Sequence, residues 1–244
     1  MEGKMLYSGK DLRKLIIPLI IEQILAIAVG MADTIMVSAA GEAAVSGVSL
    51  VDTVNILLIN VFSALATGGA VVSGHFLGKK KREDACKSAW QILLFATLLA
   101  FVISVIFITA HDPLLRLMFG KIEDDVMNAS KTYLIITTYS FVALAIYNSC
   151  AALFRAMNES KVTMWVSLLM NVINVVGNAI CIYGLHMGVA GVAIPTTISR
   201  YVAAVVIFLL MFQTKKEINL CGQITWKFNG SLIKKILYLS LIHI

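Results

Sequence analysis

Long runs of hydrophobic residues, separated by short polar stretches, dominate the chain. Six of these runs are long enough to cross a bilayer, which takes about 20 residues of helix. They are predicted at residues 13–37, 46–74, 87–110, 128–154, 162–184 and 189–213. The stretch "HDPLLRLMFGKIEDDVMNAS" mixes apolar and charged residues, and it predicts a short interfacial helix before the fourth run. The pattern therefore predicts an all-α fold, a polytopic membrane helical bundle.

The composition supports a membrane protein and offers little for catalysis. Of the 244 residues, 59% are hydrophobic and only 14% are charged, whereas soluble domains carry about 25% charged residues. The four cysteines and four histidines are scattered, without metal or disulfide spacing. Because no nucleophile or metal constellation lies within a span, we expect neither an enzyme nor a resident cofactor or metal.

The basic residues predict the orientation. Of the 20 lysines and arginines, Arg116, Lys121 and Lys131 fall on one side of the predicted spans and Arg200 falls inside one, while all the others lie on the opposite side. Positive charge marks cytoplasmic loops. The N-terminus is therefore predicted to be cytoplasmic, in a multi-pass plasma membrane protein. The basic stretch "GKKKRED" is interpreted as the same topology signal, so no nucleic-acid partner is expected.

Four charged residues stand out because they lie away from the ends of the predicted spans: Glu22, Asp33, Asp52 and Arg200. A charge at the centre of a membrane helix costs about 2.5–3.5 kcal/mol on insertion scales, so such residues are by default candidates for function. Glu22 and Asp33 differ by only about 20° around the first helix. Arg200 is expected to pair with an acid, either Asp52 or Glu22, because an unpaired buried cation would be costly.

Amides add to these charges. Asn171, Asn174 and Asn178 follow an i, i+3, i+7 pattern, which places them along one stripe of the fifth span. Asp52 and Asn55 form an i, i+3 pair in the second span. If these faces converge, they line a polar cavity for water, ions or substrate. The alternative is that the asparagines only hold helices together, as polar residues do in membranes.

Several stretches resemble the multidrug and toxic compound extrusion (MATE) family. They are "IIPLIIEQILAIAVGMADTIMVSAAGEAAVSGVS", "GHFLGKKKRED", "AALFRAMNESKVTM" and "NVINVVGNAICIYGLHMGVAGVAIPTTISR", and the resemblance covers about residues 10 to 238. It implies a six-span lobe of a twelve-span transporter that exports lipophilic or cationic organic compounds in exchange for Na⁺ or H⁺. It also implies that Asp33, Asn174 and Asn178 take part in ion coupling. Many members carry aspartate at the position of Asn178, which leaves the coupling ion open.

Two other functions stay open at this point. A flippase of lipid-linked saccharides from the same superfamily is the closest alternative, although Arg200 is the sole cationic residue away from the span ends to hold a pyrophosphate. A channel is a different class, and no symmetric pore loops are apparent in the sequence.

The resemblance also bears on the domains. Residues 1–213 are expected to form the N-terminal lobe and 214–230 a cytoplasmic linker between lobes, with 231–244 a truncated start of a seventh span. The missing C-terminal lobe is then a partner, besides membrane lipid and small-molecule substrates. The last six residues, "LSLIHI", match the translation of a transposon end used to prepare sequencing libraries, so residues 239–244 are interpreted as foreign to the natural protein. An ordinary start of an apolar helix is the alternative.

Overall fold

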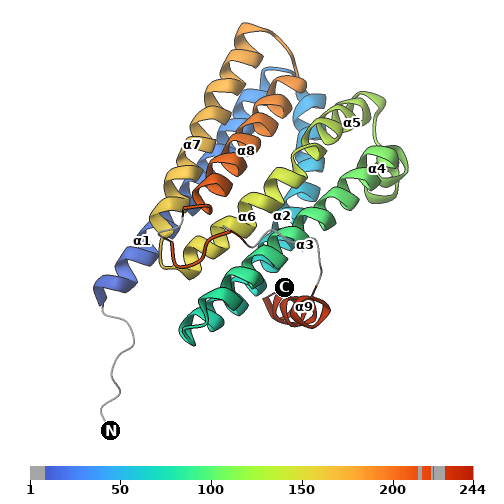
Figure 1. The fold of residues 1–244 in the computed structure, drawn as a ribbon. Coiled ribbons are helices and arrows are strands. Elements are labelled where there is room, and N and C mark those ends of the chain that lie inside the picture. Colours follow the sequence, from blue (N-terminus) through green and yellow to red (C-terminus); the bar gives the residue numbers. More distant parts are fainter. Residues whose placement is uncertain (1–8, 214–215, 221, 223–228, 244) are drawn as a thin grey trace.

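The computed structural model describes residues 9–213, 216–220, 222 and 229–243, and nearly all of them are helical (Figure 1). Part of the predicted linker 214–230 therefore lies outside the described residues. In chain order the elements are α1 (Gly9–Ser38), α2 (Glu42–Gly78), α3 (Arg82–Thr109), α4 (His111–Phe119), α5 (Asp124–Thr138), α6 (Phe141–Ala156), α7 (Ser160–Ala179), the π-helical turn η1 (Ile180–Gly184), α8 (Ala190–Leu210) and α9 (Gly230–His243).

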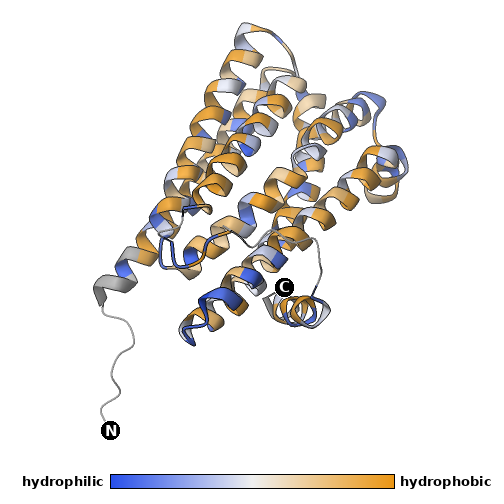
Figure 2. Ribbon diagram, viewed as in Figure 1, coloured by the Kyte–Doolittle hydropathy of each residue, from blue (hydrophilic) through white to orange (hydrophobic). Residues whose placement is uncertain are grey.

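The helical membrane bundle predicted from the sequence is confirmed. The described residues hold five helices that are long and apolar enough to cross a membrane, and a sixth span if the bent pair α5 and α6 counts as one. Figure 2 shows apolar residues along most of each helix and polar residues towards the helix ends. Large apolar side chains on α1 are exposed, among them Ile24, Ile27, Met31 and Ile35, and such a surface suits lipid.

The fourth span is not the single helix predicted over residues 128–154. It consists of α5 and α6, which meet at an angle of 51°. Hydroxyl groups explain the break, since Thr137 donates to the Tyr133 carbonyl (2.8 Å) and Thr138 to the Leu134 carbonyl (2.6 Å). Ser140 donates in turn to the Thr137 carbonyl, at 2.6 Å. Such bonds to the carbonyls of the preceding turn bend helices.

Side chains of α8 satisfy the backbone oxygens around this break. The Thr197 hydroxyl donates to the Ile136 carbonyl at 3.0 Å, and the Tyr201 hydroxyl donates to the Tyr139 carbonyl at 2.8 Å. Irregular backbone within a membrane is tolerated where protein groups satisfy it. Hydrogen bonds from α8 therefore hold the break between α5 and α6 in place.

The helix before this span forms as predicted. It is α4, a short helix outside the membrane-spanning segments. Its Asp112 carboxylate lies 2.6 Å from the Lys131 ammonium. That partner holds the pKa of Asp112 below its ordinary value.

The helices pack in two connected groups. α7 packs between α1 and α8, while α2 packs against α3, α5, α6 and α9; α8 joins the groups through α5 and α6 (Figure 1). Glycines permit the closest approaches. A Cβ on Gly69 of α2 would lie 2.4 Å from the Ile92 side chain of α3, so only glycine fits there.

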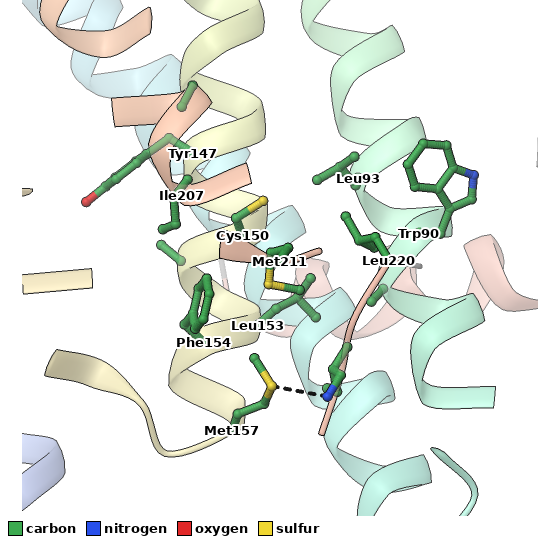
Figure 3. Close-up of a cluster of buried hydrophobic side chains, with 14 of the residues drawn as sticks. Trp90, Leu93, Tyr147, Cys150, Leu153, Phe154, Met157, Ile207, Met211 and Leu220 are labelled. Carbon is green, nitrogen blue, oxygen red and sulfur yellow. Dashed lines mark hydrogen bonds between the residues drawn. The ribbon is translucent and has the colours of Figure 1, made fainter. Parts of the chain in front are cut away.

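One apolar cluster closes the basic end of the bundle, where α3, α6 and α8 meet. Figure 3 shows Leu153, Phe154 and Met211 at its centre. The segment after α8 returns to this cluster, because the Ile218 amide donates to the Met157 sulfur at 3.2 Å. This cluster does not include Asp33, Asn174, Asn178 or Arg200.

Candidate functional site

Asp33 of α1 is joined directly to α7. The Asn178 amide donates to a carboxylate oxygen of Asp33 at 2.6 Å, across the interface between the two helices. Asn178 is fully buried, whereas Asp33 is half-buried. Since burial makes a carboxylate costly unless it is hydrogen-bonded or neutralised, Asp33 is placed where a proton or a cation would stabilise it.

A chain of hydrogen bonds continues from Asn178 to α8. The same Asn178 amide lies 3.3 Å from the Asn174 oxygen, and the Asn174 amide donates to the Thr196 hydroxyl at 2.9 Å. Asp33, Asn174 and Asn178 are therefore brought together, with Thr196 as an addition. The sequence held one signal for Thr196, because it lies four residues before Arg200 and so on nearly the same face of its helix.

One oxygen atom of this cluster has spare acceptor capacity. The Asn178 side-chain oxygen is buried and has no hydrogen-bond partner among the described residues. The Thr196 hydroxyl accepts from Asn174 and donates to the Val192 carbonyl, so the oxygen atoms available to an ion are those of Asn178 and of the Asp33 carboxylate. Hard cations prefer oxygen ligands, and a proton on Asp33 is the other way to neutralise the site.

A second polar cluster surrounds Asp52. Its carboxylate accepts a hydrogen bond from Asn55 at 3.3 Å and also interacts with the Tyr133 hydroxyl of α5. The Arg200 guanidinium donates to the Ser140 hydroxyl at 2.9 Å, at the break between α5 and α6. Arg200 also interacts electrostatically with both Asp52 and Asp33, so the two clusters share one positive charge.

Glu22 belongs to a different cluster, one that the sequence did not reveal. Its carboxylate lies 2.7 Å from the Arg155 guanidinium of α6, and it also accepts hydrogen bonds from Tyr147 (3.4 Å) and Thr163 (3.2 Å). The expectation that Arg200 pairs with Glu22 is therefore wrong. The sequence predicts Arg155 to be a loop charge that marks topology, because its position at the end of "AALFR" gives no sign of a buried partner.

Asn171 stays apart from the other two amides of the stripe. Its side chain is buried, and its amide nitrogen has no hydrogen-bond partner among the described residues. The i, i+3 spacing from Asn171 to Asn174 thus places both on one face without joining them. Within the described part of the chain, no three His, Cys, Asp or Glu side chains gather as transition-metal ligands would.

Comparison with known proteins identifies the family. The family model described as MatE matches residues 18–180, well over half of the chain. This chain belongs to the MatE family. The resemblance seen in the sequence is thereby confirmed, and the matched range runs from within α1 to the end of α7, including Asp33, Asn174 and Asn178.

Curated MatE relatives are about twice as long as this chain. The "Uncharacterized transporter YisQ" of Bacillus subtilis is 31% identical over 199 residues, which cover 80% of this chain and 43% of YisQ. The "Probable multidrug resistance protein NorM" of Thermotoga maritima is 26% identical over 211 residues, covering 85% of this chain and 45% of NorM. The chain thus spans about half the length of the curated relatives it matches.

Solved structures agree on the fold. An outward-facing multidrug resistance MATE family transporter of the MOP superfamily superposes with a TM-score of 0.85 at 24% identity, over 95% of this chain and 52% of the other. A MOP superfamily transporter from Pyrococcus furiosus gives a TM-score of 0.86 at 24% identity, over 95% of this chain and 51% of the other. The chain therefore has the fold of one lobe of a larger transporter.

Proposed function

We propose that this chain forms one lobe of a secondary antiporter, which exports lipophilic or cationic organic compounds in exchange for Na⁺ or H⁺. The observation that carries the proposal is the 2.6 Å hydrogen bond between Asn178 and the Asp33 carboxylate, within a buried cluster of oxygen ligands. Membership of a family with multidrug transporters supports the substrate class.

The proposed coupling step is the neutralisation of Asp33. With the site empty, the carboxylate is held by Asn178 alone on the described helices. A proton or Na⁺ that binds there offsets the free-energy cost of burying the Asp33 charge. The hydrogen bond from Asn178 then contributes less to the stability of the site. Ion occupancy then changes the relative stability of two arrangements of α1 against α7, and substrate release is linked to the favoured arrangement.

A second lobe is part of this proposal. The described helices leave much of α1 exposed, and the curated relatives are about twice as long. The second lobe would cover the substrate pathway, with the N-terminus of this lobe on the cytoplasmic side. The cavity that holds the organic substrate would lie between the lobes, as transporter sites lie between repeats.

The test is efflux from cells or vesicles that contain the lobe assembled with its second lobe. A fluorescent organic cation such as ethidium is followed with and without a Na⁺ or pH gradient. Asp33→Asn is expected to abolish gradient-driven efflux while leaving insertion in the membrane intact. The matched control is Asp112→Asn, which removes a carboxylate on the exposed α4 and is expected to keep transport.

Efflux by Asp33→Asn at the rate of the unmodified protein would contradict the role of Asp33. Flux that is equal with and without an ion gradient would instead favour a channel. Transport of a lipid-linked saccharide without export of organic cations would favour the flippase.

A further inference from the structure

A groove runs between α2 and α9 at the end of the bundle that holds the basic loops. It has a volume of about 800 Å³, which is within the range of small-molecule sites. Its walls are apolar, with Val71 and Phe76 on α2 and Leu239 on α9. Nothing in the proposed antiport chemistry uses this groove, which lies on the opposite end of α2 from Asp52.

The shape of the groove follows from how the two helices cross. A Cβ on Gly68 would lie 2.7 Å from the Ile236 carbonyl and 2.9 Å from the Ser240 nitrogen, so the two backbones touch there. On the basic side of this crossing the helices are separated by larger side chains. The Asn229 amide, which precedes α9, is held by the Gln91 side chain at 3.0 Å. This hydrogen bond joins the start of α9 to α3.

Three lysines rim the groove: Lys79 from the end of α2, and Lys234 and Lys235 from the first turns of α9. All are exposed, and none forms an ion pair with any acid of the described residues. Lys80, Lys81 and Lys161 at the same end also have no ion pair among the described residues but lie outside the groove, whereas Lys87, Lys131 and Lys216 each have a carboxylate partner. No acidic residue of the described chain lines the groove.

An apolar trough with a cationic rim, at the end of membrane helices, matches the chemistry of one ligand class. We propose that the groove binds an anionic glycerophospholipid, with its phosphate among Lys79, Lys234 and Lys235 and an acyl chain along Val71, Val72 and Phe76. Basic pockets between membrane helices hold anionic headgroups in this way. Tyr238 also lines the groove and is 68% exposed, as an aromatic residue at the membrane–water boundary often is.

Native mass spectrometry of the 244-residue chain in a mild detergent tests the proposal. The chain is titrated with phosphatidylglycerol and, separately, with phosphatidylcholine of the same acyl chains. The anionic lipid is expected to bind at a concentration several-fold lower. Because each lysine near a headgroup contributes about 1 kcal/mol, Lys79→Gln, Lys234→Gln and Lys235→Gln are each expected to weaken phosphatidylglycerol binding about fivefold.

A matched control removes the same amount of positive charge from the same end of the bundle. The triple variant Lys80→Gln, Lys81→Gln, Lys161→Gln removes equal charge from the same end of the bundle, at exposed positions outside the groove. It is expected to bind phosphatidylglycerol as the unmodified chain does. Val71→Asn, at an exposed position of the apolar wall, is expected to weaken binding of both lipids. Circular dichroism checks that each variant keeps its helices.

The proposal is overturned if the two lipids bind equally, or if the control triple loses as much affinity as the three groove lysines together. Displacement of the lipid by soluble glycerol 3-phosphate would also overturn it, since the groove would then bind a free anion. Should the triple variant Lys79→Gln, Lys234→Gln, Lys235→Gln fail to fold, the single lysine variants decide the question.

Discussion

Glu22 and Arg155 form an ion pair of 2.7 Å that joins α1 to α6. The Glu22 side chain is 10% exposed and that of Arg155 is 30% exposed, so the pair is largely shielded from solvent. The Tyr147 and Thr163 hydroxyls complete the hydrogen bonds of the carboxylate. Because Glu22 and Asp33 lie on nearly one face of α1, this helix is held to its neighbours at two polar points.

Removing one member of this pair should destabilise the lobe. Arg155→Gln leaves the Glu22 carboxylate without its cation, and we expect a loss of about 2 kcal/mol, which is the scale of a charged hydrogen bond with partial exposure. The double variant Glu22→Gln, Arg155→Gln should recover part of that loss, because no charge is then left unpaired. Thermal unfolding in detergent, followed by circular dichroism, measures each change.

The control for this cycle is Lys87→Gln. Lys87 pairs with Glu83 at the same distance of 2.7 Å, but the two side chains are 54% and 73% exposed. A surface ion pair of this kind contributes little to stability, so the midpoint of thermal unfolding should hardly change. A double variant that is less stable than Arg155→Gln alone would show that the pair does not act as described.

A second prediction concerns the choice of coupling ion. Asn178→Asp places a second carboxylate at hydrogen-bonding distance from Asp33, and two such acids cannot both stay charged without a cation. Transport by the assembled protein should become more dependent on pH or on Na⁺, which is measured by efflux across a series of each. The same change at Asn171, on the same helix but outside the cluster, should leave both dependences nearly unchanged. Identical profiles for Asn178→Asp and the unmodified protein would make position 178 a packing residue.

How far the sequence predicts this molecule depends on the scale of the feature. Hydropathy alone predicts the spans, because lipid requires long apolar helices. It does not predict the break at Tyr139 and Ser140, since that bend depends on hydroxyls that bond to the backbone and on donors from α8. Helical periodicity places Asn174 and Asn178 on one face, but only the packing of α1 on α7 brings Asp33 to them.

Charged partners across helices were the least predictable. The sequence places Glu22, Asp52 and Arg200 within membrane spans, but not Arg155, because a residue at a helix end resembles any loop arginine. Sequence spacing describes neighbours along one helix. It contains no information on which of several distant cations reaches a given acid.

A third prediction follows from the shared charge of Arg200. Its guanidinium bonds to Ser140 and acts on Asp52 and Asp33 at longer range. Arg200→Ala should therefore lower stability by about 1–3 kcal/mol, as loss of a charged hydrogen bond does. Adding Asp52→Asn should restore part of it, whereas adding Glu22→Gln should restore none, because Glu22 is paired with Arg155. Thermal unfolding of the three variants tests this expectation. Recovery of stability on adding Glu22→Gln would refute the assignment of Asp52 as a partner of Arg200.

The last prediction concerns the contact that sets the geometry of the ion cluster. A Cβ on Gly177 of α7 would lie 2.7 Å from the Cβ of Pro195 on α8. Gly177 precedes Asn178 and Pro195 precedes Thr196, so this close approach fixes the separation of the two cluster residues. Gly177→Ala should force α7 and α8 apart, at a cost of about 1–3 kcal/mol as for overpacking.

That separation should lengthen the bond between Asn174 and Thr196 and weaken the ion dependence of efflux more than it weakens folding. Gly30→Ala is the control, since a Cβ on Gly30 of α1 meets nothing within 4 Å and alanine favours the helix. The two variants are compared by thermal unfolding and by the Na⁺ or proton concentration that gives half-maximal efflux. If Gly177→Ala leaves that concentration unchanged while its stability falls, then the contact serves packing alone, and the position of Thr196 does not matter for coupling.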